Sequence, residues 1–266
     1  MTPDGPITSV ANPRVKAAVR LRDRRERDAS GLTILDGVRE IGRALDAGVE
    51  VVEAFVSQPA NGRGLADLGA RVTAADGRLT PVSQAVLAKL AFGDRSDGIV
   101  AIVRPPTAQL ADLRLPENPL VVVVEGVEKP GNLGAIVRTA DGAGANAVIA
   151  ADPLTDVFNP NTIRASVGTI FRMPVAVAPS DAVLGWLSAH GIVPFATRVD
   201  APTLYTDVNL RGAVAIVLGS EAAGLSHAWT GPQVTPVRIP MLGGADSLNV
   251  SVAAAVLLYE ARRQRT

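Results

Sequence analysis

Asn132-Leu-Gly-Ala-Ile-Val-Arg-Thr-Ala140 follows a run of β-branched residues, and two later stretches of the chain have the same character. They are Leu218-Gly-Ser-Glu-Ala-Ala-Gly-Leu-Ser226 and Ile239-Pro-Met-Leu-Gly-Gly-Ala-Asp-Ser-Leu-Asn249. Each stretch begins where a short apolar run ends, and each combines glycines with a charged or amide side chain. Because ligands of an open α/β sheet bind beyond the carboxyl ends of its strands, the three stretches are predicted to converge on one cleft.

The composition indicates a globular chain of two domains. The 266 residues are 47% hydrophobic and 20% charged, and this length allows each of two domains to bury a core. The longest apolar runs are far shorter than the ~20 residues of a membrane span, and the N-terminus lacks the pattern of a signal peptide. A cytoplasmic protein without membrane contact is therefore expected. The chain has no cysteine and only two histidines, His190 and His227, so disulfides are excluded and no metal site is expected.

Basic residues are concentrated near the N-terminus, although the formal net charge of the chain is zero. Seven of them lie between Arg14 and Arg27, against only Asp23 and Glu26. Asn12-Pro13 is a favourable helix start, so one helix is predicted from there to about residue 28. Arg20, Arg24 and Arg27 then lie at i, i+4 and i+7 and share a face that can follow a phosphate backbone. The alternative is a solvated helix without a partner.

The first half of the chain alternates between extended and helical patterns. Strands are predicted at residues 32–35, 51–56, 71–74 and 99–103, helices at 38–47 and 82–90, and a loop at 57–64. This alternation predicts a small α/β sandwich with a largely parallel sheet. Residues 104–119 contain four prolines and little periodicity, which is typical of an interdomain linker.

The second half begins with Leu120-Val-Val-Val-Val124, a run typical of a strand buried on both faces. A helix at 133–143 and a strand at 147–150 complete a βαβ unit. Further strands are predicted at 175–177, 193–196, 214–218 and 234–239, with a helix near 182–189. The closing helix, 248–263, is apolar almost all round, which predicts that it is buried and that it forms a subunit interface.

Two common kinds of site do not match this sequence. The segment after Val124 lacks the G-x-G-x-x-G pattern of a dinucleotide-binding fold, and the glycine-rich loops come late in the chain instead. Ser220, Ser226 and Ser247 have no histidine at the spacing of a nucleophile and its base.

The three stretches resemble the motifs of the SpoU (TrmH-like) RNA ribose 2′-O-methyltransferases, a branch of the SPOUT class. The first motif matches Asn132, Gly134 and Arg138. The second matches Gly219, Glu221 and Gly224-Leu-Ser226, with Ser220 in place of the common asparagine. The third matches Ile239-Pro-Met241 and Ser247-Leu-Asn249. The resemblance covers about residues 121–261.

This resemblance implies an α/β domain over residues 119–266 with a deep trefoil knot that holds S-adenosylmethionine, and it implies pairing into a homodimer through this domain. It implies catalytic roles for Arg138, Asn132, Glu221 and Asn249, with Glu221 orienting Arg138 or a ribose hydroxyl. The residues expected at the cofactor are Thr197, Leu218, Gly219, Gly224, Ile239, Met241, Ser247 and Leu248. The family assigns the deprotonation step to Arg138. Because a guanidinium hardly deprotonates, stabilisation of an alkoxide is the alternative role.

The first half resembles the L30e-like RNA-binding domain that many family members carry. Asp36-Gly-Val-Arg39 and the run at 98–103 carry this similarity, which places the RNA-binding domain at 1–105 and a linker at 106–118. Arg39 and Arg164 are expected to contact RNA together with Arg20, Arg24 and Arg27.

The function implied is methylation of a ribose 2′-hydroxyl in structured RNA, with 23S ribosomal RNA as the expected partner. Transfer RNA is the alternative substrate, and a non-catalytic RNA-binding protein on the same fold is the alternative of another class. Relatives of this layout include housekeeping enzymes and self-resistance enzymes of antibiotic producers, which the sequence does not separate.

Overall fold

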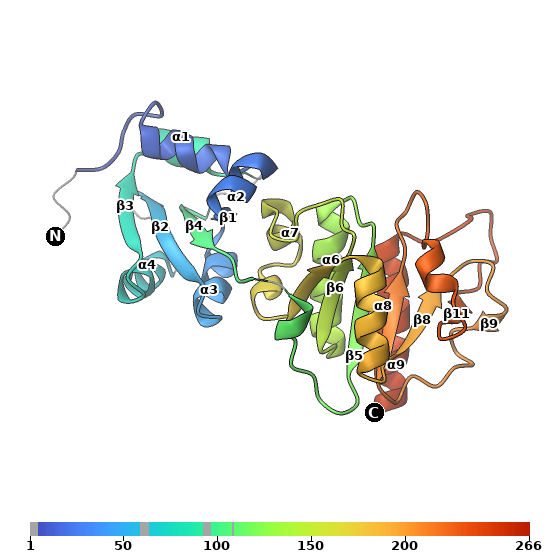
Figure 1. The fold of residues 1–266 in the computed structure, drawn as a ribbon. Coiled ribbons are helices and arrows are strands. Elements are labelled where there is room, and N and C mark those ends of the chain that lie inside the picture. Colours follow the sequence, from blue (N-terminus) through green and yellow to red (C-terminus); the bar gives the residue numbers. More distant parts are fainter. Residues whose placement is uncertain (1–4, 59–63, 93–96, 108) are drawn as a thin grey trace. The chain divides into compact units, whose positions relative to one another are not determined.

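The computed structural model of the chain describes residues 5–58, 64–92, 97–107 and 109–266. It divides into two compact units (Figure 1). The first comprises Met1–Pro106 and Phe158–Arg172, and the second comprises Thr107–Val157 and Met173–Thr266. The predicted boundary near residue 105 therefore coincides with a boundary between the units. The segment Phe158–Arg172 does not follow the predicted division, because it belongs to the first unit.

Among the described residues, the first unit has a four-stranded sheet in the order β1-β4-β2-β3. Its strands are β1 (Thr33–Asp36), β2 (Glu50–Ser57), β3 (Arg78–Val82) and β4 (Ile99–Arg104). β2 and β3 are parallel, but β4 runs antiparallel to both β1 and β2. The prediction of a largely parallel sheet was therefore wrong for this unit. The alternation of elements does not determine the direction in which the last strand enters between two earlier ones.

Helices complete the α/β sandwich of the first unit. α1 (Pro13–Arg20) and α5 (Gln84–Leu90) pack on a core that includes Phe55 and Val100. α3 (Val38–Asp46) and α4 (Leu65–Ala74) pack against each other, and α4 also packs on β2 and β3. The strand predicted at 71–74 was wrong, because these residues form the last turn of α4. Leu65, Leu68, Gly69 and Val72 are buried at helical spacing, so burial overrides the β-branched character of Val72-Thr73. The loop predicted at 57–64 lies mostly outside the described residues.

The basic segment near the N-terminus forms two helices rather than the single helix that was predicted. α1 ends at Arg20, and α2 (Arg24–Ser30) starts at Asp23, whose side chain accepts a hydrogen bond from the Arg25 N–H at 2.9 Å. Gly31 ends α2 in the left-handed conformation, with φ 66°. Because the helix is interrupted, the i, i+4, i+7 spacing does not place Arg20, Arg24 and Arg27 on a common face.

In the second unit, the described residues form a seven-stranded sheet in the order β7-β6-β5-β10-β8-β11-β9. Its strands are β5 (Leu120–Glu125), β6 (Ala147–Ala151), β7 (Val175–Ala178), β8 (Val193–Thr197), β9 (Thr203–Leu204), β10 (Val214–Leu218) and β11 (Thr235–Arg238). Every recorded pairing in this sheet is parallel. All six residues of β5 are buried, which confirms the predicted strand with two covered faces.

Helices cover both faces of this sheet. Val121 and Val123 of β5 lie in a core with Val183 and Leu187 of α8 (Ser180–Ala189) and with Trp229 of η3 (His227–Thr230). α6 (Pro130–Ala143) and α9 (Val250–Arg265) pack against each other, and both also contact the sheet. The linker region contains the short helix η1 (Leu110–Asp112), and Leu110, Leu113 and Leu115 pack at the edge of the α8 core.

α9 is less buried than its sequence predicts. Leu257 and Leu258 are buried, whereas Val252 and Tyr259 are 48% and 54% exposed. These two residues are seven positions apart and share one face of the helix.

Within the described ranges, no helix has the length and apolar character that crossing a membrane requires.

The segment Phe158–Arg172 belongs to the first unit because of specific hydrogen bonds. It contains α7 (Pro160–Ala165) and η2 (Thr169–Phe171). Thr33 donates its hydroxyl to the Phe158 carbonyl at 2.9 Å, and Arg43 donates to the Val167 carbonyl at 2.7 Å. These partners are more than 100 residues apart in the chain, so no local pattern predicts their pairing.

Candidate active site

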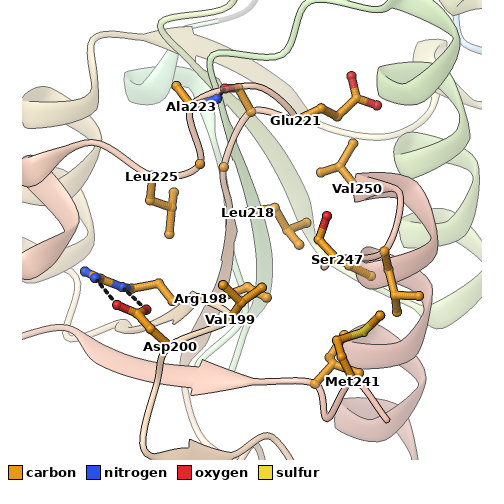
Figure 2. Close-up of a pocket in the computed structure, with 17 residues that line it drawn as sticks. Arg198, Val199, Asp200, Leu218, Glu221, Ala223, Leu225, Met241, Ser247 and Val250 are labelled. Atoms are coloured by element: carbon orange, nitrogen blue, oxygen red, sulfur yellow. Dashed lines mark hydrogen bonds and ion pairs between the residues drawn. The ribbon is translucent and has the colours of Figure 1, made fainter. Parts of the chain in front are cut away.

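A cavity of about 480 Å³ lies at the carboxyl edge of the second sheet (Figure 2). Its walls come from the residues that follow β8, β10 and β11 and from the first turns of α9. A volume between about 300 and 1,000 Å³ is typical of a site for a small organic molecule. The position agrees with the rule that open α/β sheets bind ligands beyond the carboxyl ends of their strands.

All eight residues that were predicted to bind the cofactor line this one cavity. They are Thr197, Leu218, Gly219, Gly224, Ile239, Met241, Ser247 and Leu248. The lining also includes Glu221, which was predicted as catalytic, and the motif residues Ser220 and Leu225. No motif identified the remaining lining residues, which are Arg198, Val199, Asp200, Ala223, Val250 and Ala253. Arg198, Val199 and Asp200 directly follow the predicted residue Thr197 at the end of β8, and this position was the signal that could have identified them.

The loop after β10 is a tight turn whose shape requires glycine. The Ser220 N–H donates to the Gly224 carbonyl at 3.1 Å, and the Gly224 N–H donates to the Ser220 carbonyl at 3.0 Å. Gly224 has φ 68°, in the left-handed region that favours glycine. A Cβ atom on Gly219 would lie 2.3 Å from the Gly224 carbonyl carbon, so the backbone approaches too closely for any side chain.

The lining of the cavity suits a ligand with apolar and polar parts. Leu218, Ile239 and Val250 provide aliphatic surface, and Ser247 adds a hydroxyl to the lining (Figure 2). The Thr197 hydroxyl is buried and has no hydrogen-bond partner among the described residues. An unpaired buried hydroxyl costs free energy, and a polar group of a ligand in the cavity would provide the missing partner.

A charged pair forms part of the same wall. Arg198 donates to both carboxylate oxygens of Asp200, at 3.0 and 2.9 Å. The hydrogen bond from Arg198 lowers the pKa of the Asp200 carboxyl below its usual range. This pair therefore adds polar surface to a cavity whose other walls are mainly aliphatic.

A polar cluster next to the cavity brings together three of the four predicted catalytic residues. Glu221 accepts hydrogen bonds from the side-chain amides of Asn132 and of Asn249, the latter at 3.3 Å. The Asn249 amide also donates to Asn132 Oδ1 at 3.4 Å. Lys129, which no motif identified, forms an ion pair with Glu221 at 3.5 Å. We call these four residues the Glu221 cluster.

Two helix starts account for the position of the Glu221 cluster. Lys129 is the N-cap residue of α6, Asn132 lies in the first turn of that helix, and Asn249 caps α9 by accepting from the Ser251 N–H at 2.9 Å. The positive ends of both helix dipoles stabilise a carboxylate at this point. Asn249 thus has two roles, since it caps a helix and contacts Glu221.

Arg138 is not a member of the Glu221 cluster. It is exposed on α6, and it does not line the cavity. Among the described residues, the recorded partners of Glu221 are Asn132, Asn249 and Lys129, so the structure contains no contact by which Glu221 would orient Arg138. Of the stretch 132–140, Asn132 therefore reaches the site and Arg138 does not. The loop after β8 contributes to the cavity wall in place of this stretch.

The basic residues of the first unit divide into structural and exposed ones. Arg14 pairs with the buried Glu53, and Arg22 donates to the carbonyls of Lys89, Leu90 and Ala91 at 2.9 Å each. Arg27 is 5% exposed and donates to the carbonyls of Leu21 and Arg22. The expectation that Arg27 contacts RNA was therefore wrong, because its guanidinium is used inside the protein.

The other predicted RNA contacts are more accessible. Arg20, Arg24 and Arg39 are exposed, although Arg24 also forms an ion pair with Asp28. Arg164 is half-buried and donates to the Phe92 carbonyl at 2.6 Å. It lies near Asp36, where burial raises the pKa of the carboxyl while the Phe92 N–H and the Arg164 charge partly oppose the shift.

In the part of the chain that the structure describes, no group of three or more His, Asp or Glu side chains is arranged to hold a metal ion.

Comparison with known families identifies the class of protein that this fold and site define. Residues 119–259, more than half of the chain, match the SpoU rRNA Methylase family, and residues 12–101 match the MRM3-like substrate binding domain. The chain belongs to the SpoU rRNA methylase family. The prediction of an S-adenosylmethionine-dependent RNA methyltransferase of this family is thereby confirmed.

Individual relatives cover almost the whole chain. The 23S rRNA (uridine(2479)-2′-O)-methyltransferase of Streptomyces viridochromogenes is 32% identical over 254 residues, which are 92% of this chain and 87% of that protein. A crystal structure of an RNA 2′-O ribose methyltransferase is 44% identical, with a TM-score of 0.86 and coverage of 98% of this chain and 99% of the other. The AdoMet-bound rRNA methyltransferase from Sinorhizobium meliloti is 31% identical, with a TM-score of 0.89 and coverage of 97% of each chain.

Proposed function

We propose that this protein transfers a methyl group from S-adenosylmethionine to a ribose 2′-hydroxyl of 23S ribosomal RNA. The observation that carries the proposal is the cavity at the carboxyl edge of the second sheet, which all eight expected cofactor residues line beside the Glu221 cluster. A relative at 32% identity is named as a methyltransferase of 23S rRNA, and a structure at 31% identity is an AdoMet-bound rRNA methyltransferase.

The residues of the cavity hold the donor and exclude water from it. When bound, S-adenosylmethionine supplies the methyl group of its sulfonium, which the 2′-oxygen attacks in line. Leu218, Ile239 and Val250 would provide apolar surface for the donor, and the Thr197 hydroxyl would provide a polar contact. Correct alignment of two reacting groups can contribute about 7–11 kcal/mol to the lowering of a barrier.

The 2′-hydroxyl must also lose its proton, which is released to solvent. Arg138 is exposed, so it can contact a phosphate of the RNA and stabilise the developing alkoxide. Glu221 is held by Asn132, Asn249 and Lys129, and we propose that it orients a ribose hydroxyl rather than Arg138.

RNA binding and methyl transfer are assigned to different domains. We propose that residues 1–105 bind RNA, that 106–118 connect the domains, and that 119–266 carry the cofactor and the chemistry. The match of residues 12–101 to a substrate binding domain supports the first assignment. As an enzyme that acts on ribosomal RNA, the protein is proposed to work in the cytoplasm.

Methylation assays test the proposal directly. The full-length chain is incubated with labelled S-adenosylmethionine and either 23S rRNA or transfer RNA, and 2′-O-methyl positions are mapped. Label in 23S rRNA supports the proposal, and label confined to transfer RNA favours the alternative substrate. Binding of RNA with no label in either would instead indicate a non-catalytic RNA-binding protein.

RNA affinity is expected to depend on exposed basic residues of the first domain. Lys16 and Arg20 are both exposed and lie at i and i+4 on α1. Binding to phosphates releases counterions, so Lys16→Glu/Arg20→Glu should lower RNA affinity and flatten the log–log salt dependence by about 0.7–0.9 for each phosphate that the variant no longer neutralises. Filter binding at several salt concentrations measures the slope, and calorimetry should give unchanged S-adenosylmethionine affinity.

Two variants serve as controls for this prediction. Arg78→Glu reverses an exposed charge at the start of β3 and should leave the slope unchanged. Arg27→Ala should instead reduce the free energy of unfolding by about 1–3 kcal/mol, because the Leu21 and Arg22 carbonyl groups lose their donor. If the double reversal binds RNA as the parent does at every salt concentration, this face of α1 is only a solvated surface.

We also propose that the protein forms a homodimer through its second domain. The exposed Val252 and Tyr259 on one face of α9 support this, since they leave apolar surface uncovered. Val252→Glu should weaken the dimer by about 30-fold or more, as expected for a charge placed in an interface core. Val193→Glu, at an exposed valine of β8, is the control that should sediment as the parent does. A parent chain that is monomeric at micromolar concentration would contradict the proposal.

Finally, we propose that the second domain contains the trefoil knot implied by its family. The strand order supports this, because β11 lies beyond β8 while the following α9 returns to pack on α6. Pulling the chain from both ends in optical tweezers would then leave a tightened knot. The unfolded contour should be shorter than that of 266 extended residues, and a full-length contour would contradict the knot.

A further inference from the structure

Glu125, the last residue of β5, is a buried carboxylate that no sequence motif singled out. Its exposed fraction is 6%. Oε1 accepts hydrogen bonds from the hydroxyls of Ser180 and Ser226, at 2.6 and 2.7 Å. Oε2 accepts the Ser226 N–H at 2.7 Å. Both oxygens of the carboxylate therefore bind Ser226, and one of them also binds the first residue of α8.

Ser226 ends the loop that forms one wall of the cavity. The two residues before it, Gly224 and Leu225, line the cavity, and Gly219 packs directly against them. The paired hydrogen bonds between Ser220 and Gly224 make the turn between them one compact piece, and this piece carries Glu221. Ser226 therefore adjoins the part of the loop that lines the cavity, and a shift of Ser226 would displace that wall.

We propose that Glu125 is a positioning residue for S-adenosylmethionine binding, acting through Ser226 on the loop after β10. The inference rests on the proposed use of the cavity for this donor. Two hydrogen bonds to one residue, one from its backbone and one from its side chain, set both its location and its orientation. Glu125 belongs to a central strand of the sheet, so the rigid part of the domain places the loop.

Substitutions at the two ends of this contact separate positioning from general stability. Glu125→Gln keeps the volume but presents an amide NH₂ where one carboxylate oxygen accepted a hydrogen bond. Because Ser226 bonds both oxygens, either its N–H or its hydroxyl loses an acceptor in each orientation of the amide. Ser226→Ala removes the hydroxyl and keeps the backbone N–H. Ser180→Ala is the matched control, because it removes a hydrogen bond of nearly the same length from the same carboxylate without touching the loop.

The experiment measures the Kd of S-adenosylmethionine by calorimetry on the full-length chain, with the melting temperature of each variant recorded. Glu125→Gln should raise the Kd by about 10-fold or more and Ser226→Ala by about five-fold. Ser180→Ala should lower the melting temperature as Ser226→Ala does and leave the Kd unchanged. In the Glu125→Gln/Ser226→Ala double variant, the increase in Kd should be smaller than the product of the single effects.

Each other outcome would overturn the inference. It fails if Ser226→Ala binds as the parent does, if Ser180→Ala weakens binding as much as Ser226→Ala, or if the two effects multiply in the double variant. Should Glu125→Gln not fold, the contrast between Ser226→Ala and Ser180→Ala decides alone. A parent chain that binds no S-adenosylmethionine would overturn the proposed function itself, which distinguishes the two failures.

Discussion

Arg138→Ala is expected to slow methyl transfer by about 10²–10³-fold, the usual cost of losing a group that stabilises charge in the transition state. The variant should bind S-adenosylmethionine as the parent does, because Arg138 does not line the cavity. It should also fold normally, since the side chain is exposed on α6. Single-turnover rates with saturating donor and RNA measure the loss.

The exposed Arg211 provides a matched control for Arg138. It lies beside Leu120, the first residue of β5, at the edge of the sheet opposite the cavity. Arg211→Ala removes the same charge and should retain the parent rate. If Arg138→Ala keeps more than a third of the parent turnover, Arg138 has no place in the mechanism.

Gly219→Val is expected to weaken S-adenosylmethionine binding by about 100-fold. Even a Cβ atom at this position would lie 2.3 Å from the Gly224 carbonyl carbon and 2.5 Å from the Leu225 nitrogen. The loop must move away to accept the side chain. Misplacing a group in a site by about 1 Å can reduce the rate of the reaction there about 10²-fold, and we expect a similar loss of donor affinity. Calorimetry with the full-length chain measures the loss of affinity.

Gly243→Ala provides the comparison for this substitution. Gly243 lies in the loop after β11, and a Cβ atom there meets no other atom within 4 Å. This variant should bind the donor normally, whereas Gly219→Ala should already weaken binding. Parent-like affinity in Gly219→Val would mean that the loop after β10 does not contact the donor.

Much of the second domain could be predicted from local patterns. The β-branched run at β5 is buried on both faces, as its sequence indicates. The residues at the ends of β8, β10 and β11 are brought together because parallel strands end at one edge of their sheet. All eight residues expected at the cofactor therefore line one cavity. The strand ends predicted a shared cleft, and the resemblance to the family motifs supplied the individual residues.

The first domain shows where local patterns do not suffice. The β-branched pair Val72-Thr73 favours a strand, but it lies in α4 because Val72 completes a buried helical face with Leu65 and Leu68. The basic segment breaks into two helices at Asp23, which turns Arg27 inward to buried carbonyls. In α4, burial of one helical face outweighs a local preference of a fraction of a kcal/mol per residue.

The sequence by itself determined the α/β class of fold and the buried strands, because these follow from periodicity and from residue types next to one another. The eight residues expected at the cofactor came from the resemblance of three stretches to the motifs of a known family. Only the tertiary structure decided that β4 runs antiparallel between β1 and β2, that Phe158–Arg172 joins the first unit, and that Glu221 contacts Asn132 and Asn249 rather than Arg138. It also placed Glu125 beneath Ser226, 101 residues further along the chain. Contacts of this kind depend on which elements meet in space, and that is determined by the packing of the whole domain.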